Sequence, residues 1–179
     1  MNQSKLFKGL VMSMALLLTT TTFLFAQAKP PASPAATATG TLKNGAHITI
    51  NYSSPSVKGR AIWGALVPFD KVWRAGANNA TLIETDKEVK VEGKTLAAGK
   101  YSIYAIPGQQ EWVIIINSVT GQSGMNHDGS TTLDPTKDVM RVTVKSKKSA
   151  TMNERLVYTI NDQGFVLSWE NLDVPVSIK

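Results

Sequence analysis

Cysteine is absent from the chain, and histidine occurs only twice, as His47 and His127. The missing thiols exclude disulfide bonds, a cysteine nucleophile and thiolate metal ligands. They also exclude the lipid-modified cysteine that tethers many exported bacterial proteins to a membrane. The two histidines lie far apart in the sequence, and no acidic residues join them at a metal-ligand spacing. We therefore expect no metal and no cofactor.

Amphipathic helical patterns with capping residues are also missing, and a two-residue period takes their place. Apolar residues alternate with polar ones in short runs, which puts one face of each strand in a core and the other in water. These runs cover residues 46–52, 88–92, 140–145, 156–160, 165–169 and 174–178. The continuously apolar run 112–116 differs from them and predicts a central strand covered on both faces.

Turn residues separate the runs, as an antiparallel protein requires. The segment Asn161–Gly164 predicts a tight hairpin, and Pro175 assigns the last strand to a sheet edge because proline lacks a backbone N–H. Eight or more short strands predict an all-β fold, an antiparallel β-sandwich of jelly-roll-like character, with a barrel as the alternative. We expect the two halves of the sandwich to pack through the four tryptophans Trp63, Trp73, Trp112 and Trp169.

The chain divides into three parts. Residues 1–28 combine two early lysines, an uncharged apolar stretch and the small-x-small ending Ala26-Gln27-Ala28, which predicts a cleaved signal peptide. Residues 29–44 are rich in Pro, Ala and Thr, and we expect a flexible leader because they offer little apolar surface to bury. Residues 45–179 predict a single β-sandwich domain.

The predicted signal peptide implies that the protein is exported. We expect a periplasmic or secreted protein with no membrane span after signal cleavage. The formal net charge of +6 falls to +4 when Lys5 and Lys8 leave with the signal peptide, so the mature chain is only mildly basic. We expect no nucleic-acid partner, because an exported protein rarely meets chromosomal nucleic acid.

Two long segments show little alternation. Residues 53–80 carry Pro, Gly, Arg, Trp and Asn, and residues 118–138 are rich in Gly, Ser, Thr, Asn and Asp. Irregular segments of this length are uncommon within a compact domain and are often functional. We therefore look for a site in or beside them.

The first of these segments also carries a resemblance to a known family. Residues 54–69 read SPSVKGRAIWGALVPF, and residues 72–81 read VWRAGANNAT. Together with Gly99-Lys100-Tyr101, Ile106-Pro107-Gly108 and Glu111-Trp112, they resemble the exported bacterial family known as domain of unknown function 2911, over roughly residues 46–178. The resemblance implies a Gram-negative origin, a signal peptide and one small domain, and it implies no activity.

Four residues of this segment form the candidate ligand-binding site: Arg60, Trp73, Arg74 and Asn78. Arginine offers a rigid fork suited to carboxylates, sulfates and phosphates, and tryptophan offers a flat face suited to a sugar ring. A purely structural role is the alternative, with the arginines satisfying backbone carbonyls and Asn78 holding a turn. Complete burial of the Arg74 guanidinium against carbonyls would exclude it from a binding site.

Other chemistry has weaker support. The glycines Gly59, Gly64 and Gly76 fit no phosphate-loop spacing, and the segment 126–129 lacks the glycine position and closing glutamate of a calcium loop. The segment 121–125 has Met125 where a nucleophile elbow needs glycine. No pair of carboxylates stands out for glycoside hydrolysis.

The preferred hypothesis is therefore a non-enzymatic envelope or secreted binding module for an anionic or carbohydrate ligand. A structural or protein-interaction domain of the cell envelope is the first alternative. A hydrolase acting on a glycan or ester is the second.

Overall fold

The computed structural model describes residues 31–179, so the predicted signal peptide lies outside the described residues. Within that range the chain forms ten strands and one short 3-10 turn, Pro135–Lys137. The strands are β1 (Ala35–Thr41), β2 (His47–Ser53), β3 (Thr81–Thr85), β4 (Val89–Val91), β5 (Lys94–Leu96), β6 (Gly99–Ile106), β7 (Glu111–Asn117), β8 (Asp138–Lys145), β9 (Lys147–Asn161) and β10 (Gly164–Ser177). The predicted all-β fold is confirmed.

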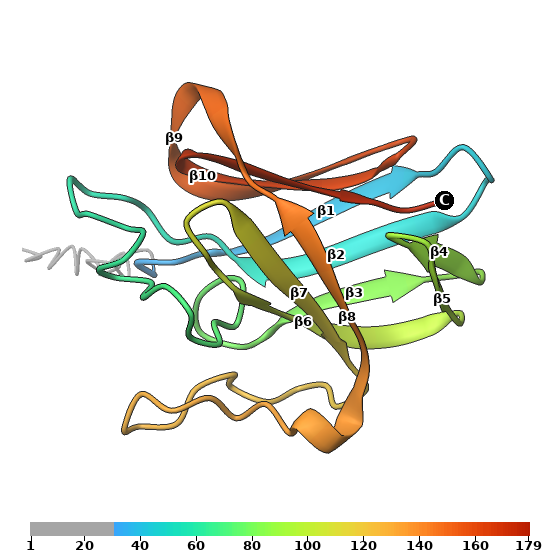
Figure 1. Cartoon of the computed structure of the whole chain (residues 1–179), viewed down its shortest axis with the longest axis horizontal. Helices are drawn as coiled ribbons and strands as arrows, with labels where there is room; N and C mark the ends of the chain where they lie inside the picture. The colour runs from blue at the N-terminus through green and yellow to red at the C-terminus, as the bar shows by residue number, and fades with distance from the viewer. Residues whose placement is uncertain (1–30) are drawn as a thin grey trace, which may run out of the picture.

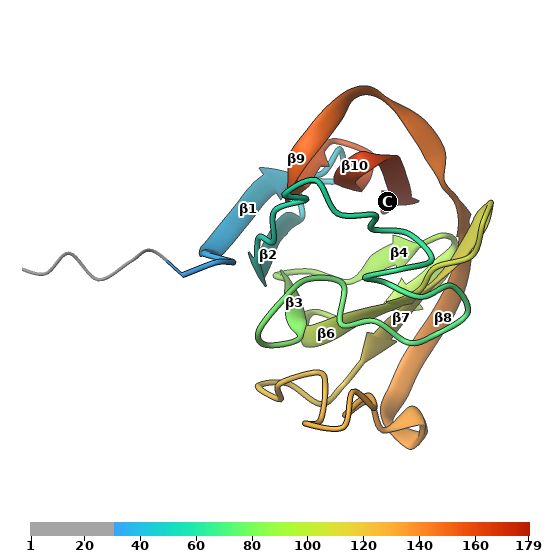
Figure 2. The same cartoon turned by 90° about the vertical axis from the view of Figure 1, so that its left-hand side faces the viewer.

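Six strands form one antiparallel sheet in the order β1-β2-β3-β6-β7-β8, while β9 pairs with β10 and β4 with β5. The large sheet is open, with β1 and β8 at its edges, so the fold is not the closed barrel considered as an alternative. Figures 1 and 2 show the β9–β10 hairpin lying across the large sheet, which gives a sandwich-like arrangement. None of the helical turns in residues 31–179 has the length and apolar content that crossing a membrane demands.

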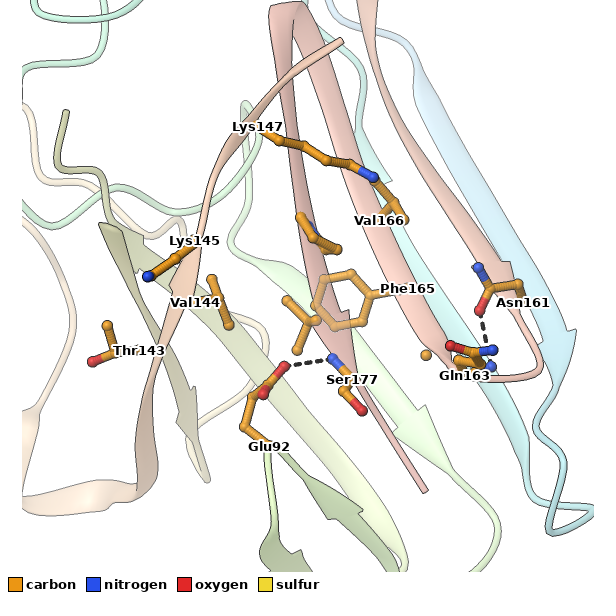
Figure 3. A pocket seen from close by; sticks show the side chains of 13 residues that line it. Glu92, Thr143, Val144, Lys145, Lys147, Asn161, Gln163, Phe165, Val166 and Ser177 are labelled. Carbon is orange, nitrogen blue, oxygen red and sulfur yellow. Dashed lines mark hydrogen bonds between the residues drawn. The ribbon is translucent and has the colours of Figure 1, made fainter. Parts of the chain in front are cut away.

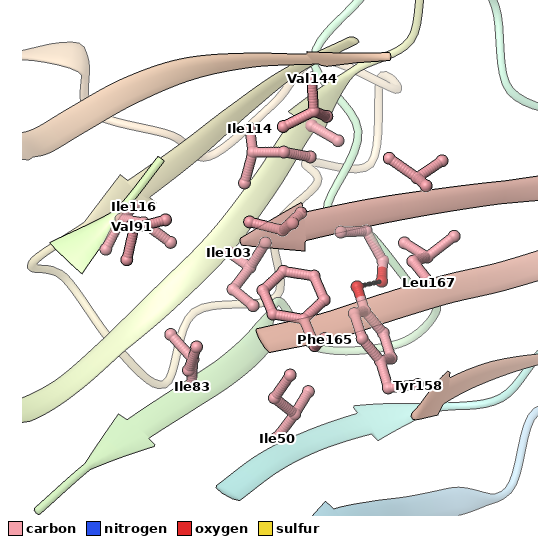
Figure 4. Packing of buried hydrophobic residues seen from close by; sticks show 14 of the residues in the cluster. Ile50, Ile83, Val91, Ile103, Ile114, Ile116, Val144, Tyr158, Phe165 and Leu167 are labelled. Carbon is pink, nitrogen blue, oxygen red and sulfur yellow. Dashed lines mark hydrogen bonds between the residues drawn. The ribbon is translucent and has the colours of Figure 1, made fainter. Parts of the chain in front are cut away.

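The core lies between the large sheet and the hairpin. Ile50, Ile83 and Ile103 project from neighbouring strands of the sheet, and Phe165 and Leu167 project from β10 to meet them (Figure 4). Their alternation with polar neighbours is the two-residue period of the sequence, because a strand sends successive side chains to opposite faces. The sequence therefore identified the core-facing residues of β2 and β10, whereas Ile83 and Ile103 lie outside its alternating runs.

Strand β7 is buried on both faces, as its continuous apolar run predicted. Ile114 and Ile116 belong to the main core, whereas Ile115 packs with Tyr104 and Leu133 in a second cluster. The strand is penultimate in the sheet rather than central. Its outer face is covered by the irregular segment 118–137, which runs beneath the sheet in Figure 1.

The prediction of a flexible leader over residues 29–44 is wrong for β1. Residues 35–41 pair with residues 47–53 of β2 in continuous register. Gly40 lies so close to Ile160 of β9 that an added Cβ would come within 2.6 Å of that side chain. Strand β1 is therefore held by its backbone hydrogen bonds to β2 and by its close approach to β9. This close approach requires small residues in β1. Burial of large side chains does not hold the strand.

The predicted hairpin turn joins β9 to β10, with the Gln163 N–H donating to Asn161 Oδ1 at 2.9 Å. Pro175 lies beyond Asp173, the last β10 residue paired with β9. The chain then pairs briefly with β4 through Ile178 and Val91. The proline therefore interrupts no ladder between β9 and β10.

Candidate functional site

The irregular segment 54–80 is fixed at both of its ends. At one end, the Val57 N–H donates to the Glu154 carbonyl at 2.8 Å, and the Ser54 hydroxyl donates to the Leu156 carbonyl at 2.7 Å. At the other end, Trp73 and Ala105 of β6 exchange two backbone hydrogen bonds of 2.7 and 2.8 Å. The segment thus spans from the hairpin to the large sheet, and its middle is supported from both sides.

The backbone of this segment is held in an unusual conformation. Lys58, Asp70, Ala75 and Asn78 have positive φ angles, and they make up four of the six such non-glycine residues in the part of the chain described. Residues of this kind persist only where surrounding contacts fix them, and they cluster at functional sites. The backbone of this segment is therefore fixed in a defined conformation.

Two buried hydroxyls lock the residue next to Arg74. The Ala75 carbonyl accepts hydrogen bonds from Thr81 Oγ1 at 2.9 Å and from Tyr158 Oη at 2.8 Å. Burial raises the pKa of the Tyr158 phenol well above its ordinary range, so this donor stays protonated. The position of Arg74 is therefore set by contacts from β3 and β9.

The four tryptophans meet at this end of the core, as expected from the sequence. Trp63 packs edge-on against the other three rings, with its centroid 4.9 Å from that of Trp112. Trp73 instead stacks on Trp169 of β10, with centroids 6.0 Å apart and an interplanar angle of 16°. The Trp73 Nε1–H donates to the Gly76 carbonyl at 3.1 Å, which fixes the ring.

A pocket of about 360 Å³ opens beside this tryptophan pair, and we call it the basic pocket. Three of the four predicted site residues, Arg60, Trp73 and Arg74, line it. Its lining is Ala32, Ser33, Pro55, Ser56, Lys58, Arg60, Leu66, Val67, Trp73, Arg74, Gly76, Ala77, Met125 and Trp169.

Arg74 is partly buried and only partly satisfied. Its Nη1 donates to the carbonyls of Asn78 and Ser123, and its Nε is buried with no hydrogen-bond partner among residues 31–179. Burial lowers the pKa of the guanidinium, and nearby Tyr104 partly raises it. Since two carbonyls take both hydrogens of Nη1, Nη2 keeps two N–H donors that no described residue accepts. The guanidinium is therefore not fully buried against carbonyls, the condition that would have excluded it.

Arg60 is anchored in the same way. Its Nε donates to the Val57 carbonyl at 3.0 Å, and its Nη2 donates to the Ser56 carbonyl. An arginine has five N–H donors, so three remain free of these two bonds. Both arginines are thus held by backbone carbonyls while they keep unused donors.

No carboxylate lines the basic pocket. Two ion pairs occur among residues 31–179, Lys100 with Glu84 at 3.1 Å and Arg141 with Asp138 at 2.7 Å, and neither involves a pocket residue. Residues 1–30 contain no aspartate or glutamate that could supply one. Three cationic side chains, Lys58, Arg60 and Arg74, therefore line the pocket, and no acid lies in the lining with them. A carboxylate does lie close by, because Glu154 Oε1 accepts the Lys58 backbone N–H at 3.0 Å.

Asn78 is not brought into this lining. Its Nδ2 donates to the Ser33 carbonyl at 3.0 Å and to Ser53 Oγ at 3.1 Å, and its φ is 58°. These contacts fit the structural role considered as the alternative, because asparagine tolerates the left-handed region and holds turns. Asn78 ties the start of β1 to the end of β2.

Sequence reasoning missed several lining residues. Trp169 comes from β10, and Met125 comes from the segment 118–137. Trp169 belonged to an alternating run that predicts only a core position, and nothing near Met125 indicates a pocket. Lys58 lay within the family motif, and its positive charge beside Arg60 was the one available signal.

A second pocket, of about 520 Å³, lies where β8 and β10 face each other (Figure 3). Lys145 and Lys147 approach it, but Glu92 also lines it and accepts the Ser177 N–H at 2.6 Å. Phe165 is its one aromatic residue. The mixed charge and the absence of stacked tryptophans make it a weaker anion site than the basic pocket.

The acidic residues outside the basic pocket are the candidates for metal ligands and for general acids. Within residues 31–179, no three His, Asp or Glu side chains are placed to share a metal ion. Hydrogen bonds from Ser130 and Thr136 lower the pKa values of the exposed carboxyls Asp128 and Asp134, respectively. Both carboxyls are therefore stabilised in the ionised form, which is unsuitable for a general acid.

Comparison with known proteins identifies the family. The model of a protein family of unknown function, DUF2911, matches residues 33–178. The chain belongs to this family, as its motifs indicated. No curated protein and no solved structure matches it.

Proposed function

We propose that this DUF2911 family member is a non-enzymatic binding module whose basic pocket takes the anionic group of a small ligand. The observation that carries the proposal is the convergence of Lys58, Arg60 and Arg74 on one pocket without any carboxylate. Arg74 is partly buried, whereas Lys58 and Arg60 are exposed. A partly desolvated guanidinium gains from a charged hydrogen-bond partner, which an anionic ligand supplies.

The arginines are preorganised for this task. Two backbone carbonyls hold each guanidinium, so ligand binding immobilises little that is not already fixed. Binding affinity is higher when less side-chain entropy is lost on binding. The unused N–H donors of Arg60 and Arg74 match carboxylate or phosphate oxygens.

The pocket also offers apolar contacts. Trp73 and Trp169 line it as a rigid floor, but they are only 8% and 1% exposed, so little of either ring face is open to a sugar. The exposed Leu66 lies beside them and suits the hydrocarbon part of a ligand. The ligand class is therefore an anion with an attached apolar group.

Binding is favoured over hydrolysis for a chemical reason. The lining of the basic pocket includes no carboxyl or imidazole that could act as general acid or base. The signal-peptide pattern of residues 1–28 supports action outside the cytoplasm, in the periplasm or the medium. A structural or protein-interaction role remains the second proposal, supported by the exposed side chain of Leu66 at the pocket.

Calorimetry and thermal melts of the purified protein test the proposal, with acetate, inorganic phosphate and glucuronate as probes. A ligand at a hundred times its dissociation constant adds about 2.7 kcal/mol to the free energy of unfolding. We expect at least one probe to raise Tm by a few degrees, and Arg60→Gln or Arg74→Gln to abolish the shift. Arg141→Gln is the matched control, because Arg141 pairs with Asp138 away from the pocket. Equal shifts in all variants, or none with any anion, would reject the proposal.

A further inference from the structure

A third hollow adjoins the basic pocket, and we call it the apolar pocket. Its volume is about 620 Å³, and its apolar lining residues are Leu66, Val67, Pro68, Val72, Trp73 and Met125. Its remaining members include Asp70, Lys71 and Ser130, which are solvent-exposed, whereas Val67 and Trp73 are buried. The inner wall is therefore apolar and the polar residues face water.

The two pockets are neighbours. Leu66, Val67, Trp73 and Met125 line both of them. Lys58, Arg60 and Arg74 lie only in the basic pocket, and Pro68 and Val72 lie only in the apolar pocket. The lining thus changes from mainly cationic to mainly apolar across the four shared residues.

The shared residues have properties that fit a chain-like ligand. The Leu66 side chain is 46% exposed, although it is a large apolar residue on a segment fixed at both ends. Methionine is unbranched and polarisable, and it adapts to irregular apolar surfaces. Leu66 and Met125, from segments far apart in the sequence, therefore offer an apolar passage between the pockets.

We propose that the ligand is a free fatty acid, a single-chain amphiphile whose carboxylate meets Arg60 and Arg74 and whose tail lies along Leu66 and Met125 into the apolar pocket. The inference rests on the proposed function, and it adds the chemical class of the ligand. Charge complementarity places the carboxylate among cations without an acid, and burial of methylenes beside Val67, Pro68 and Val72 supplies the remaining affinity.

A chain-length series tests the inference. The purified protein is titrated calorimetrically with saturated carboxylates from butanoate to dodecanoate below their micelle concentrations, and with the primary alcohols of the same lengths. Each buried methylene increases affinity roughly fourfold. We expect this increase to continue until the apolar pocket is filled, and each carboxylate to bind at least tenfold more tightly than its alcohol.

Two substitutions distinguish the contribution of the ligand's tail to binding from that of its head group. Pro68→Asp places a negative charge at a position that lines only the apolar pocket, and we expect it to remove the chain-length dependence while short carboxylates still bind. Met152→Asp is its control, because Met152 is 54% exposed on β9 and lines neither pocket. Both positions are exposed, so both variants are expected to fold, which a thermal melt checks.

The outcomes distinguish the two proposals. If short and long carboxylates bind equally well and Arg74→Gln abolishes both, the anion site stands and the fatty-acid inference fails. If no carboxylate or phosphate binds, both proposals fail. If alcohols bind as tightly as acids, or if binding occurs only to vesicles of anionic lipid, the fatty-acid inference is overturned.

Discussion

At the scale of single residues, the motif Trp73-Arg74-x-Gly76-x-Asn78 contains two kinds of role. Trp73 and Arg74 line the basic pocket, whereas Asn78 fixes the backbone with its side-chain amide and its left-handed φ. Sequence spacing could not separate these roles, because arginine and asparagine both serve as ligands for anions and as partners for carbonyls. The difference arises from which neighbours the fold provides.

Replacing Asn78 tests this division. We expect Asn78→Ala to lower the free energy of unfolding by about 1–2 kcal/mol, because the left-handed conformation disfavours alanine and two hydrogen bonds are lost. Anion affinity should change less than twofold, since Asn78 does not line the pocket. Urea unfolding and calorimetry on the same sample measure both quantities. A large loss of affinity with unchanged stability would assign Asn78 to the site.

Tyr158 gives a prediction on pH. Burial is the main cause that raises the pKa of its phenol, and the neighbouring Thr81 hydroxyl partly opposes this. The unfolded phenol ionises near pH 10, whereas the folded one stays neutral, so the stabilising contribution is complete below about pH 10 and decreases above it. We expect the free energy of unfolding to fall by up to about 1.4 kcal/mol per pH unit in this range.

The variant Tyr158→Phe provides the comparison. It loses the hydrogen bond to the Ala75 carbonyl, so we expect about 1 kcal/mol less stability at pH 8. Above pH 10 its stability should decline less steeply than that of the wild type. Urea unfolding midpoints at pH 8, 9.5, 10.5 and 11 test this expectation. If the midpoints of the two proteins fell in parallel with pH, ionisation of Tyr158 would not be the cause of the loss of stability.

At the scale of elements, alternation predicted β2, β8 and the β9–β10 hairpin because each has one face in the core and one in water. It failed for β1, whose half-buried face consists of small residues and whose pairing depends on backbone hydrogen bonds. The two irregular segments were located correctly, and Arg60, Trp73 and Arg74 of the first one do line a pocket, but the lining residues from other parts of the chain were not predicted. A pocket built from loops depends on contacts between distant segments, and local sequence does not encode these.

The segment 118–137 gives a matched pair of glycine variants. Gly124 has φ +80°, and a Cβ on it would come within 2.6 Å of Arg74 Cβ and 3.0 Å of Arg74 Cδ. Gly121 has φ +86° and open space around it. Alanine at either position costs about 1–2 kcal/mol for the left-handed conformation. Only Gly124→Ala also displaces Arg74.

We therefore expect Gly124→Ala to weaken anion binding tenfold or more and Gly121→Ala to leave it within twofold. Calorimetry with the strongest-binding probe measures the affinities, and thermal melts confirm that both variants fold, with the larger loss of stability expected for Gly124→Ala because of its clash with Arg74. Equal affinities would show that Arg74 does not need the close packing of this segment.

At the scale of the whole molecule, the basic pocket joins parts that the sequence keeps far apart. Arg60 and Arg74 lie on the segment between β2 and β3, Met125 lies between β7 and β8, and Trp169 lies on β10. The hairpin and the large sheet hold these parts at a common end of the core through Trp63, Trp73, Trp112 and Trp169. Formation of the site therefore requires the complete sandwich-like fold.

The start of the described chain contributes to that fold as well. Strand β1 covers the edge of β2 along seven paired residues, and the Pro34 carbonyl accepts the Ser54 N–H at 2.8 Å. Ala32 and Ser33 line the basic pocket. A protein that begins at residue 45 loses all of these contacts, whereas one that begins at residue 31 keeps them.

We expect the shorter protein to lose several kcal/mol of stability, at about 1 kcal/mol for each ladder hydrogen bond. Its uncovered β2 edge would also present unpaired N–H and C=O groups, so self-association should increase with concentration. Urea unfolding and size-exclusion chromatography of the two proteins test both effects. If they had equal midpoints and were both monomeric, β1 would be dispensable and residues 31–44 would behave as the flexible leader that their composition suggested. If the shorter protein lost stability but did not self-associate, β9 would be shielding the β2 edge that the removal of β1 uncovers. Strand β9 lies close enough for this, because Gly40 of β1 contacts Ile160 of β9.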